Sequence, residues 1–232
     1  MRIVGEIPAR EGSKRVPRKN LRPLNGRPMI TYAIDAAKAA ARLDEIYVNS
    51  ESEAIGRLAT DAGVKFYRRP DALSGDTITQ QEFNYDFIKA VRPDVLVLVN
   101  PVSPLIVGED IDRMVDRFLE GQLETLIAVR EEQTHACVEG RPVNFTMQEP
   151  LARTQDVMPV QLCAWSVCVW NADAFIRQYE TQGHATFVGR VGWYPLDHFR
   201  ALKVSTEDDF RFAEMLLKHR DEWQRAASLQ TS

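Results

Sequence analysis

Five consecutive apolar residues, Val95 to Val99, restrict the fold of this 232-residue chain more than any other feature. A strand with one face in water alternates apolar and polar side chains, whereas a strand covered on both faces is apolar throughout. The run therefore predicts a central strand in a sheet that has helices on both sides. Such sheets are mostly parallel and are typical of α/β folds.

Shorter apolar runs alternate with amphipathic segments on both sides of this run. The pattern predicts strands over residues 3–7, 45–48, 64–67, 125–129 and 167–170, although Glu6 interrupts the first, and helices over 28–41, 52–62 and 79–91 and from Gly108 and Thr206 onward. We expect a single α/β domain over residues 1–232, with ligands bound beyond the carboxyl ends of the strands. Residues 130–160 lose the alternation, so we expect a lid or a dimer contact at about 130–165.

Particular residues mark the ends of the predicted helices. Gly63 suits the left-handed position that follows a helix. Thr206 with Asp209 forms a weakened capping box at the start of the last helix. In that helix four residues are expected to face inward: Phe210, Ala213, Leu216 and Leu217.

The loop after the first predicted strand concentrates positive charge. Between residues 10 and 22 one acid, Glu11, stands against six basic residues: Arg10, Lys14, Arg15, Arg18, Lys19 and Arg22. Gly12 lets the backbone turn its N–H groups toward an anion, and Ser13 adds a hydroxyl donor. Because phosphoryl chemistry depends on positioning and charge stabilisation, the loop is a candidate triphosphate site. By charge count alone, a solvated basic loop is an equally good interpretation.

The sequence also argues against several classes of protein. The loop has neither a Walker A pattern nor a GxGxxG pattern, which disfavours kinases, P-loop NTPases and dinucleotide-binding proteins. A net charge of −4 disfavours bulk nucleic-acid binding. Cys137, Cys163 and Cys168 lack CxxC spacing, so zinc is disfavoured and a reducing compartment is expected. No apolar run approaches the roughly 18 residues of a membrane span, and we expect a cytoplasmic protein without a membrane partner.

Residues 7–20, IPAREGSKRVPRKN, closely resemble the signature of the acylneuraminate cytidylyltransferases, the CMP-sialic acid and CMP-KDO synthetase group. Further similar segments follow in the family's order: RPDALSGDT (69–77), NPVSPL (100–105), RTQ (153–155) with Pro159, and STEDD (205–209). The resemblance spans residues 1–218. It implies a Rossmann-like nucleotidyltransferase fold and a homodimer. The implied reaction joins CMP from CTP to a sialic-acid-like or other ulosonic sugar acid and releases pyrophosphate.

The resemblance also assigns roles to individual residues. The residues expected to bind the nucleotide are Ala9, Arg10, Gly12, Ser13, Lys14, Asn20, Arg69 and Gln80, the last three near the base and ribose. Those expected to stabilise developing charge, as catalytic residues, are Arg10, Lys14 and Lys19. Those expected to face the sugar acid are Asn100, Arg153 and Gln155. For Arg153 there is an independent reason, because a guanidinium can bind a carboxylate through two hydrogen bonds.

The chain departs from the family at the expected Mg²⁺ site. Lys203 and Ser205 stand where the family has two metal-binding aspartates. Magnesium prefers carboxylate oxygens, and an ammonium group repels it. Three interpretations stay open: Lys203 replaces a metal charge, Asp197 or Asp208 supplies a displaced ligand, or the chain is a degenerate relative.

The residues expected near the sugar acid also depart from the family's pattern. Trp165 replaces part of an NGA segment, and Ile106 replaces an arginine. These changes predict a more apolar sugar pocket, although a core position for Trp165 is the favoured interpretation. Two functional alternatives remain: a nucleotidyltransferase for another NTP and a sugar 1-phosphate, and a nucleotide-binding homologue without catalysis. The sequence names no general base.

Overall fold

The computed structural model describes residues 1–12 and 16–230, and for residues 221–230 only the course of the backbone. Its centre is a seven-stranded sheet in the order β11-β7-β10-β6-β1-β4-β5. The strands are β1 (Ile3–Pro8), β4 (Glu45–Ser50), β5 (Lys65–Arg68), β6 (Val95–Val99), β7 (Thr125–Glu132), β10 (Val160–Asn171) and β11 (Val191–Leu196). Only β10 runs antiparallel to its neighbours, β6 and β7. The predicted mostly parallel α/β sheet is therefore confirmed.

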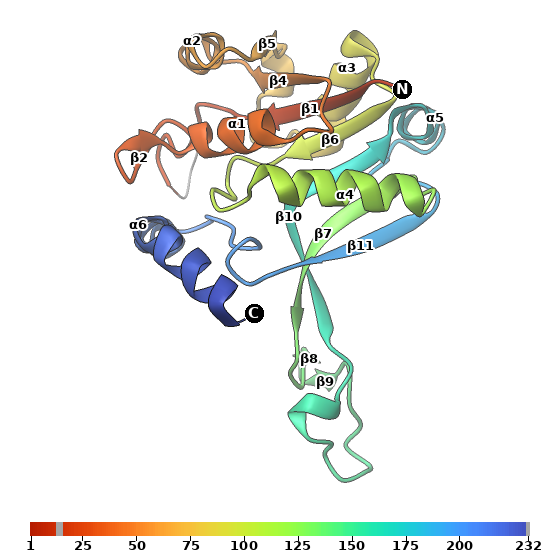
Figure 1. The fold of residues 1–232 in the computed structure, drawn as a ribbon. Helices are drawn as coiled ribbons and strands as arrows, with labels where there is room; N and C mark the ends of the chain where they lie inside the picture. Colours follow the sequence, from red (N-terminus) through yellow and green to blue (C-terminus); the bar gives the residue numbers. More distant parts are fainter. Residues whose placement is uncertain (13–15, 231–232) are drawn as a thin grey trace.

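Helices cover both faces of this sheet (Figure 1). They are α1 (Ile30–Ala39), α2 (Glu53–Asp61), α3 (Gln80–Val91), α4 (Gly108–Glu120), α5 (Ala172–Gln182) and α6 (Glu207–Gln230). Val95, Val97 and Val99 of β6 pack into the core beneath α1, α2 and α4. Leu96 and Leu98 pack on the other face, beneath α3 and α5. This division explains why β6 is apolar throughout, as its sequence predicts.

Short elements complete the chain. Two residues on each side of a tight turn form the hairpin β2 (Pro23–Leu24) and β3 (Arg27–Pro28), so α1 starts after the predicted residue 28. The other short elements are β8 (Cys137–Val138), β9 (Arg141–Pro142), η1 (Asp71–Leu73) and η2 (Thr154–Asp156). A third apolar cluster joins this hairpin to α6 and contains all four predicted inward residues of that helix.

The helix ends largely follow the sequence. Gly63 has a φ of +74°, as expected for the position after α2. The capping box of α6 is formed, because Asp209 N donates to Thr206 Oγ1 (3.2 Å) and Thr206 N donates to Asp209 Oδ2 (2.8 Å). We did not predict α5 or β11, although α5 carries an ordinary cap: Ala174 N donates to Asn171 Oδ1 (2.9 Å).

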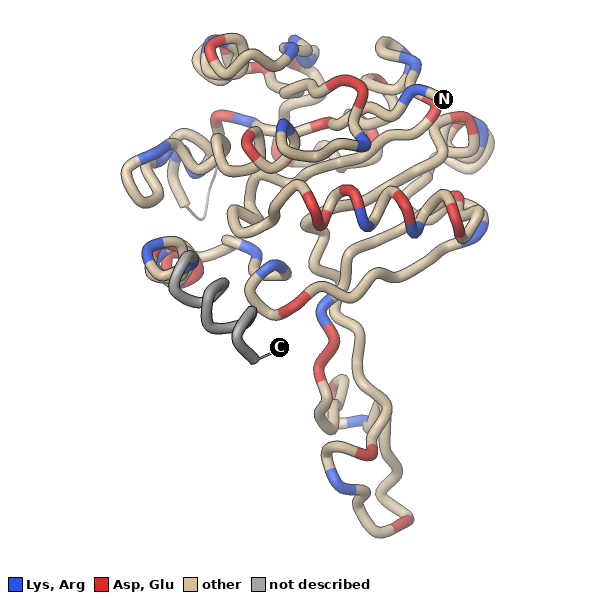
Figure 2. Tube along the Cα trace, viewed as in Figure 1, with Lys and Arg blue, Asp and Glu red and all other residues tan. Residues whose placement is uncertain are grey.

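The region expected at 130–165 forms a projecting arm. β7 and β10 stay paired beyond the sheet, with Val160 opposite Glu132, and the arm carries β8, β9 and η2 (Figure 1). Its large apolar side chains Met147, Leu151 and Met158 are exposed by 73%, 62% and 77%. Acidic and basic residues occur together on the arm and along α4 (Figure 2). Within the described residues, no helix combines the length and the apolar character needed to cross a bilayer.

Candidate active site

Two adjoining cavities lie at the carboxyl ends of β1 and β6. The first, which we call the loop cavity, has a volume of about 280 Å³. Its lining residues are Pro8, Ala9, Arg10, Gly12, Lys19, Asn20, Arg69, Gln80, Phe83, Asn100, Pro101 and Val102. Every described residue that the sequence predicts for the nucleotide is in this set. Ser13 and Lys14 lie outside the described residues.

Hydrogen bonds fix the described part of the basic loop. Ala9 N donates to Asn49 O (2.9 Å), and Asn20 Nδ2 donates to Arg10 O (2.9 Å). Arg10 also pairs with Asp76, at 2.8 Å between Nη1 and Oδ1. Lys19 Nζ donates to Val204 O (2.8 Å), which ties the loop to the segment before α6. The described part of the loop is thus held by hydrogen bonds to neighbouring segments, unlike the freely solvated loop that charge count alone allows.

Arg69 forms a buried wall of the loop cavity. It is 3% exposed, and its guanidinium carbon lies 4.1 Å from the centre of the Phe83 ring. Nε donates to Asn49 Oδ1 (2.9 Å) and Nη2 donates to Asn49 O (2.8 Å). Burial lowers the pKa of Arg69 from its usual value. Phe83 and Asn49 were not predicted, because neither residue type carries a phosphate-binding signal on its own.

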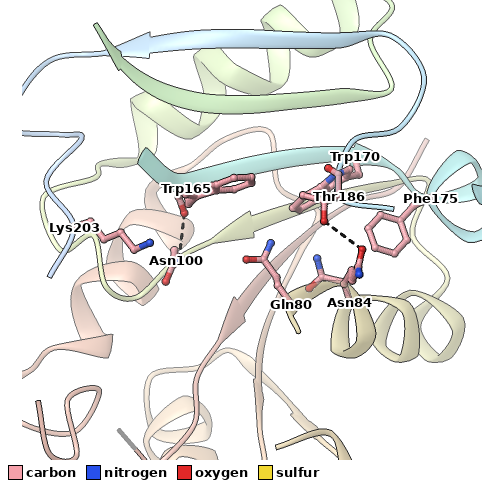
Figure 3. A pocket seen from close by; sticks show the side chains of 9 residues that line it. Gln80, Asn84, Asn100, Trp165, Trp170, Phe175, Thr186 and Lys203 are labelled. Atoms are coloured by element: carbon pink, nitrogen blue, oxygen red, sulfur yellow. Dashed lines mark hydrogen bonds between the residues drawn. The ribbon is translucent and has the colours of Figure 1, made fainter. Parts of the chain in front are cut away.

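The second cavity, which we call the aromatic cavity, has a volume of about 310 Å³. Its lining residues are Gln80, Gln81, Asn84, Asn100, Trp165, Trp170, Phe175, Thr186 and Lys203. Gln80 and Asn100 also line the loop cavity, so the two cavities adjoin there. Figure 3 shows amides from α3 and aromatic rings from β10 and α5 facing one space, with Lys203 beside Asn100.

The amides of this cavity differ in how they are bonded. Asn100 Nδ2 donates to Trp165 O (3.2 Å), and Val102 N donates to Asn100 Oδ1 (3.3 Å), so Asn100 also caps a turn. Asn84 is fully buried, and neither atom of its amide has a hydrogen-bond partner in the described part of the chain. A buried amide without partners costs about 1–3 kcal/mol and is retained most readily where a ligand pairs with it.

Trp165 and Ile106, the two apolar replacements noted in the sequence, lie in different surroundings. Trp165 lies in an irregularity of β10, between Cys163 and Cys168, and has a φ of +57°, which is strained for a bulky residue. It is half-buried, packs against the apolar cluster beneath α3 and α5, and also lines the aromatic cavity, so the favoured core position is borne out only in part. Ile106 is 3% exposed and packs in the main core, which corrects its expected place in the sugar pocket.

Arg153 and Gln155 are not near either cavity in one chain. Both are exposed and belong to the start of η2 on the arm. Arg153 Nε pairs with Asp156 Oδ2 at 2.7 Å. The structure brings Asn100 to the site but not these two residues, because β7 and β10 carry the arm beyond the sheet (Figure 1).

The residues at the expected magnesium position do not suit a metal. Lys203 lines the aromatic cavity, and Ser205 N donates to Asp209 Oδ2 (2.8 Å). Asp197 Oδ1 is engaged by the backbone N–H groups of Phe199 and Arg200. In the described ranges no three His, Cys, Asp or Glu side chains gather closely enough to hold an ion, and neither cavity lining includes a carboxylate. The described linings of the two cavities therefore offer Mg²⁺ no carboxylate of the kind it prefers.

A sequence profile of the cytidylyltransferase family matches residues 4–158, which is more than half of the chain. The chain belongs to this family. It is 26% identical to the N-acylneuraminate cytidylyltransferase of Streptococcus agalactiae serotype V, over 90% of the chain and 52% of that enzyme. It is also 26% identical to the post-translational flagellin modification protein B of Campylobacter coli, over 94% of the chain and 96% of that protein. The chain thus spans about half the length of the streptococcal relative.

The fold of the family is present as well. A solved structure of CMP:2-keto-3-deoxy-manno-octonic acid synthetase, complexed with CTP, aligns with a TM-score of 0.74 at 15% identity. The alignment covers 95% of this chain and all of the other. The Rossmann-like nucleotidyltransferase fold is therefore confirmed.

Proposed function

We propose that this family member joins CMP from CTP to an ulosonic sugar acid and releases pyrophosphate. The observation that best supports the proposal is the convergence of Arg10, Lys19 and Arg69 on one cavity at the carboxyl end of β1. Three cations, two from the basic loop and one from the residue after β5, suit a polyanionic ligand. In sheets of this kind, ligands bind at that edge.

The nucleotide would lie in the loop cavity. Arg10 and Lys19, with Ser13 and Lys14 as the sequence predicts, would bind the triphosphate, and Ala9 and Gly12 would offer backbone N–H groups. Asn20, Arg69 and Gln80 would lie beside the base and ribose. A hydroxyl of the acceptor attacks the α-phosphorus, a new P–O bond forms, the bond to the β-phosphate oxygen breaks, and the hydroxyl proton is lost. Arg10, Lys14 and Lys19 would stabilise the charge that moves onto the leaving pyrophosphate.

The acceptor would lie in the aromatic cavity. That cavity adjoins the loop cavity at Gln80 and Asn100, so an acceptor hydroxyl there can reach an α-phosphate in the loop cavity. We propose a homodimer in which the arm makes the subunit contact. A second copy's arm would give Arg153 and Gln155 a route to the sugar acid that a single chain lacks.

Charge at the expected metal position would come from Lys203. Its ammonium lies beside Asn100, where the two cavities meet (Figure 3). A cation fixed there can interact with a phosphate or with the acceptor carboxylate. Magnesium is an expectation from the resemblance, and we assign it no residue of this chain.

Pyrophosphate release, measured for each NTP with a panel of sugar acids, tests the proposal. The panel includes sugar 1-phosphates and is run with magnesium and with a chelator. We expect release only with CTP and an ulosonic acid. Release with GTP or UTP and a sugar 1-phosphate would contradict the cytidine assignment, and no release under any condition would favour a homologue without catalysis. Loss of activity in chelator would count against Lys203 as the replacement charge.

A further inference from the structure

Glu6 is a carboxylate in the middle of the most buried region of the sheet. It lies on β1, between β4 and β6, and its exposed fraction is 0%. Val4 and Ile7 beside it on the strand are also fully buried. A carboxylate in such surroundings is costly unless it is paired. Packing alone does not explain a carboxylate at this position.

The carboxylate is connected to the loop cavity by a chain of hydrogen bonds. Glu6 Oε1 accepts from Asn49 Nδ2 at 2.6 Å. Asn49, also fully buried, accepts from Arg69 Nε at Oδ1 (2.9 Å) and from Arg69 Nη2 at its backbone oxygen (2.8 Å). The same backbone oxygen accepts from Ala9 N (2.9 Å), at the start of the basic loop. One asparagine therefore joins Glu6 to both Arg69 and the basic loop.

The direction of these bonds gives Glu6 control of the Asn49 amide. An ionised carboxylate only accepts hydrogen bonds, so it holds the NH₂ end of the amide. The amide oxygen must then face Arg69. Arg69 is held between this oxygen and the Phe83 ring, with its guanidinium in the wall of the loop cavity.

We propose that Glu6 is a positioning residue for the nucleotide, which acts through Asn49 to hold Arg69 in the wall of the loop cavity. This inference rests on the proposed function, because it takes the ligand of that cavity to be CTP. Glu6 itself is buried beneath the cavity and does not line it. Its effect should therefore appear in CTP affinity and in KM for CTP, with little change in kcat.

The charge around Glu6 adds a pH dependence. Burial raises the pKa of Glu6 to about 7, opposed by the Asn49 hydrogen bond and by Arg69, while Asp86 on α3 raises the pKa further. Tyr67 of β5 donates to Asp86 (2.7 Å) and faces the same group of charges. When Glu6 gains a proton, its attraction to Arg69 is lost. CTP should therefore bind more weakly as the pH falls below 7.

Calorimetric titration with CTP between pH 6 and 8.5 tests the role of Glu6. For the wild type we expect affinity to fall about tenfold from pH 8 to pH 6, as expected for one group whose protonation state is coupled to binding. Glu6→Gln removes the charge but keeps the size. It should bind CTP about tenfold more weakly at pH 8, and between pH 8 and 6 it should lose less affinity than the wild type, because only the terminal phosphate of CTP then titrates. Its kcat should stay within about threefold of the wild type. Glu45→Gln, on the neighbouring strand, is the matched control and should leave affinity unchanged.

A double substitution separates positioning from general damage. If Glu6 acts through Arg69, Glu6→Gln should add almost nothing to the loss caused by Arg69→Lys. Wild-type affinity for CTP at pH 8 in Glu6→Gln would overturn the inference, as would fully additive losses. Should Glu6→Gln fail to fold, a flat wild-type profile between pH 6 and 8 would still overturn it. Absence of CTP binding by the wild type at every pH would refute the proposed function instead.

Discussion

The loop cavity and the aromatic cavity adjoin at Gln80 and Asn100, but their walls are built in different ways. Half of the loop cavity comes from residues 8–20, a continuous stretch that is rich in cations and braced by its own hydrogen bonds. The aromatic cavity is made from α3, β10, α5 and three loops, and Lys203 is its one charged lining residue among those described. A triphosphate site needs charges and N–H groups in a fixed order, and this requirement restricts which residues can stand in one continuous segment. An acceptor pocket needs only shape and a few polar groups, which many residue sets can supply.

The largest expected effect is a loss of kcat, and it concerns the basic loop beside the loop cavity. Lys14→Ala removes a cation that the sequence assigns to the triphosphate, and kcat should fall by about 10³-fold or more. The melting temperature should stay close to that of the wild type. Lys38→Ala, which removes an exposed cation of α1, serves as the control in the same pyrophosphate assay. Unchanged turnover in Lys14→Ala would refute the assignment of the loop to phosphate.

A second prediction concerns stability beneath the loop cavity. The pKa of Glu6 is raised to about 7 from an ordinary value of 4.5, so the folded state binds the proton more tightly than the unfolded chain. The stability gained from this carboxyl is full below pH 4.5 and is lost as the pH rises through 7, by roughly 3 kcal/mol in total. Urea unfolding of the wild type and of Glu6→Gln, repeated from pH 4.5 to pH 8, measures the contribution of Glu6 as the difference between their free energies of unfolding. Parallel curves for the two proteins would contradict the prediction.

On the aromatic side, Trp165→Gly should weaken the acceptor without affecting CTP. Glycine tolerates the positive φ at this position, so relief of strain of about 1 kcal/mol partly offsets the loss of ring contacts. We expect KM for the acceptor to rise about tenfold or more, as an aromatic wall is lost. Steady-state kinetics with each substrate varied in turn tests this. A rise in KM for CTP of the same size would mean that the cavities do not divide the substrates as proposed.

Asn84→Leu should separate stability from function in the same cavity. Because the buried amide has no partner among the described residues, an apolar side chain of similar size should raise the free energy of unfolding by about 1–2 kcal/mol. The same change should raise KM for the acceptor several-fold, because the acceptor loses a hydrogen bond worth about 1 kcal/mol. Chemical unfolding and kinetics on one preparation measure both. A destabilised protein with normal kinetics would show that Asn84 serves the fold rather than the acceptor.

The smallest effect on stability is expected in the arm. Arg153 pairs with Asp156 on an exposed surface, so Arg153→Ala should change the free energy of unfolding by less than about 0.5 kcal/mol. KM for the acceptor should nevertheless rise if a second copy's arm reaches the site. Sedimentation of the wild type together with kinetics of the variant tests both points. A monomeric wild type that is fully active would exclude this role of the arm.

Much of the fold was predictable because the decisive patterns are local. Val95 to Val99 reports a strand covered on both faces, and the stripe at Ile111, Met114 and Val115 reports the face of α4 that packs on the sheet. The strand β11 was not predictable in the same way. Five of its six residues are partly or fully exposed, and Gly192 and Pro195 interrupt its apolar pattern, so its pairing with β7 is what defines it.

The order of residues along the chain was enough to predict the basic loop and the family, because a phosphate-binding segment is expected to combine cations with a turning backbone over a short stretch. Only the tertiary structure decided that Trp165 lines a cavity while Ile106 is in the core, and that Arg153 lies far from Asn100. Only packing also joined Glu6 to Arg69, which are 63 positions apart. Side chains from distant segments interact through the sheet that brings them together, and no spacing along the sequence records that arrangement.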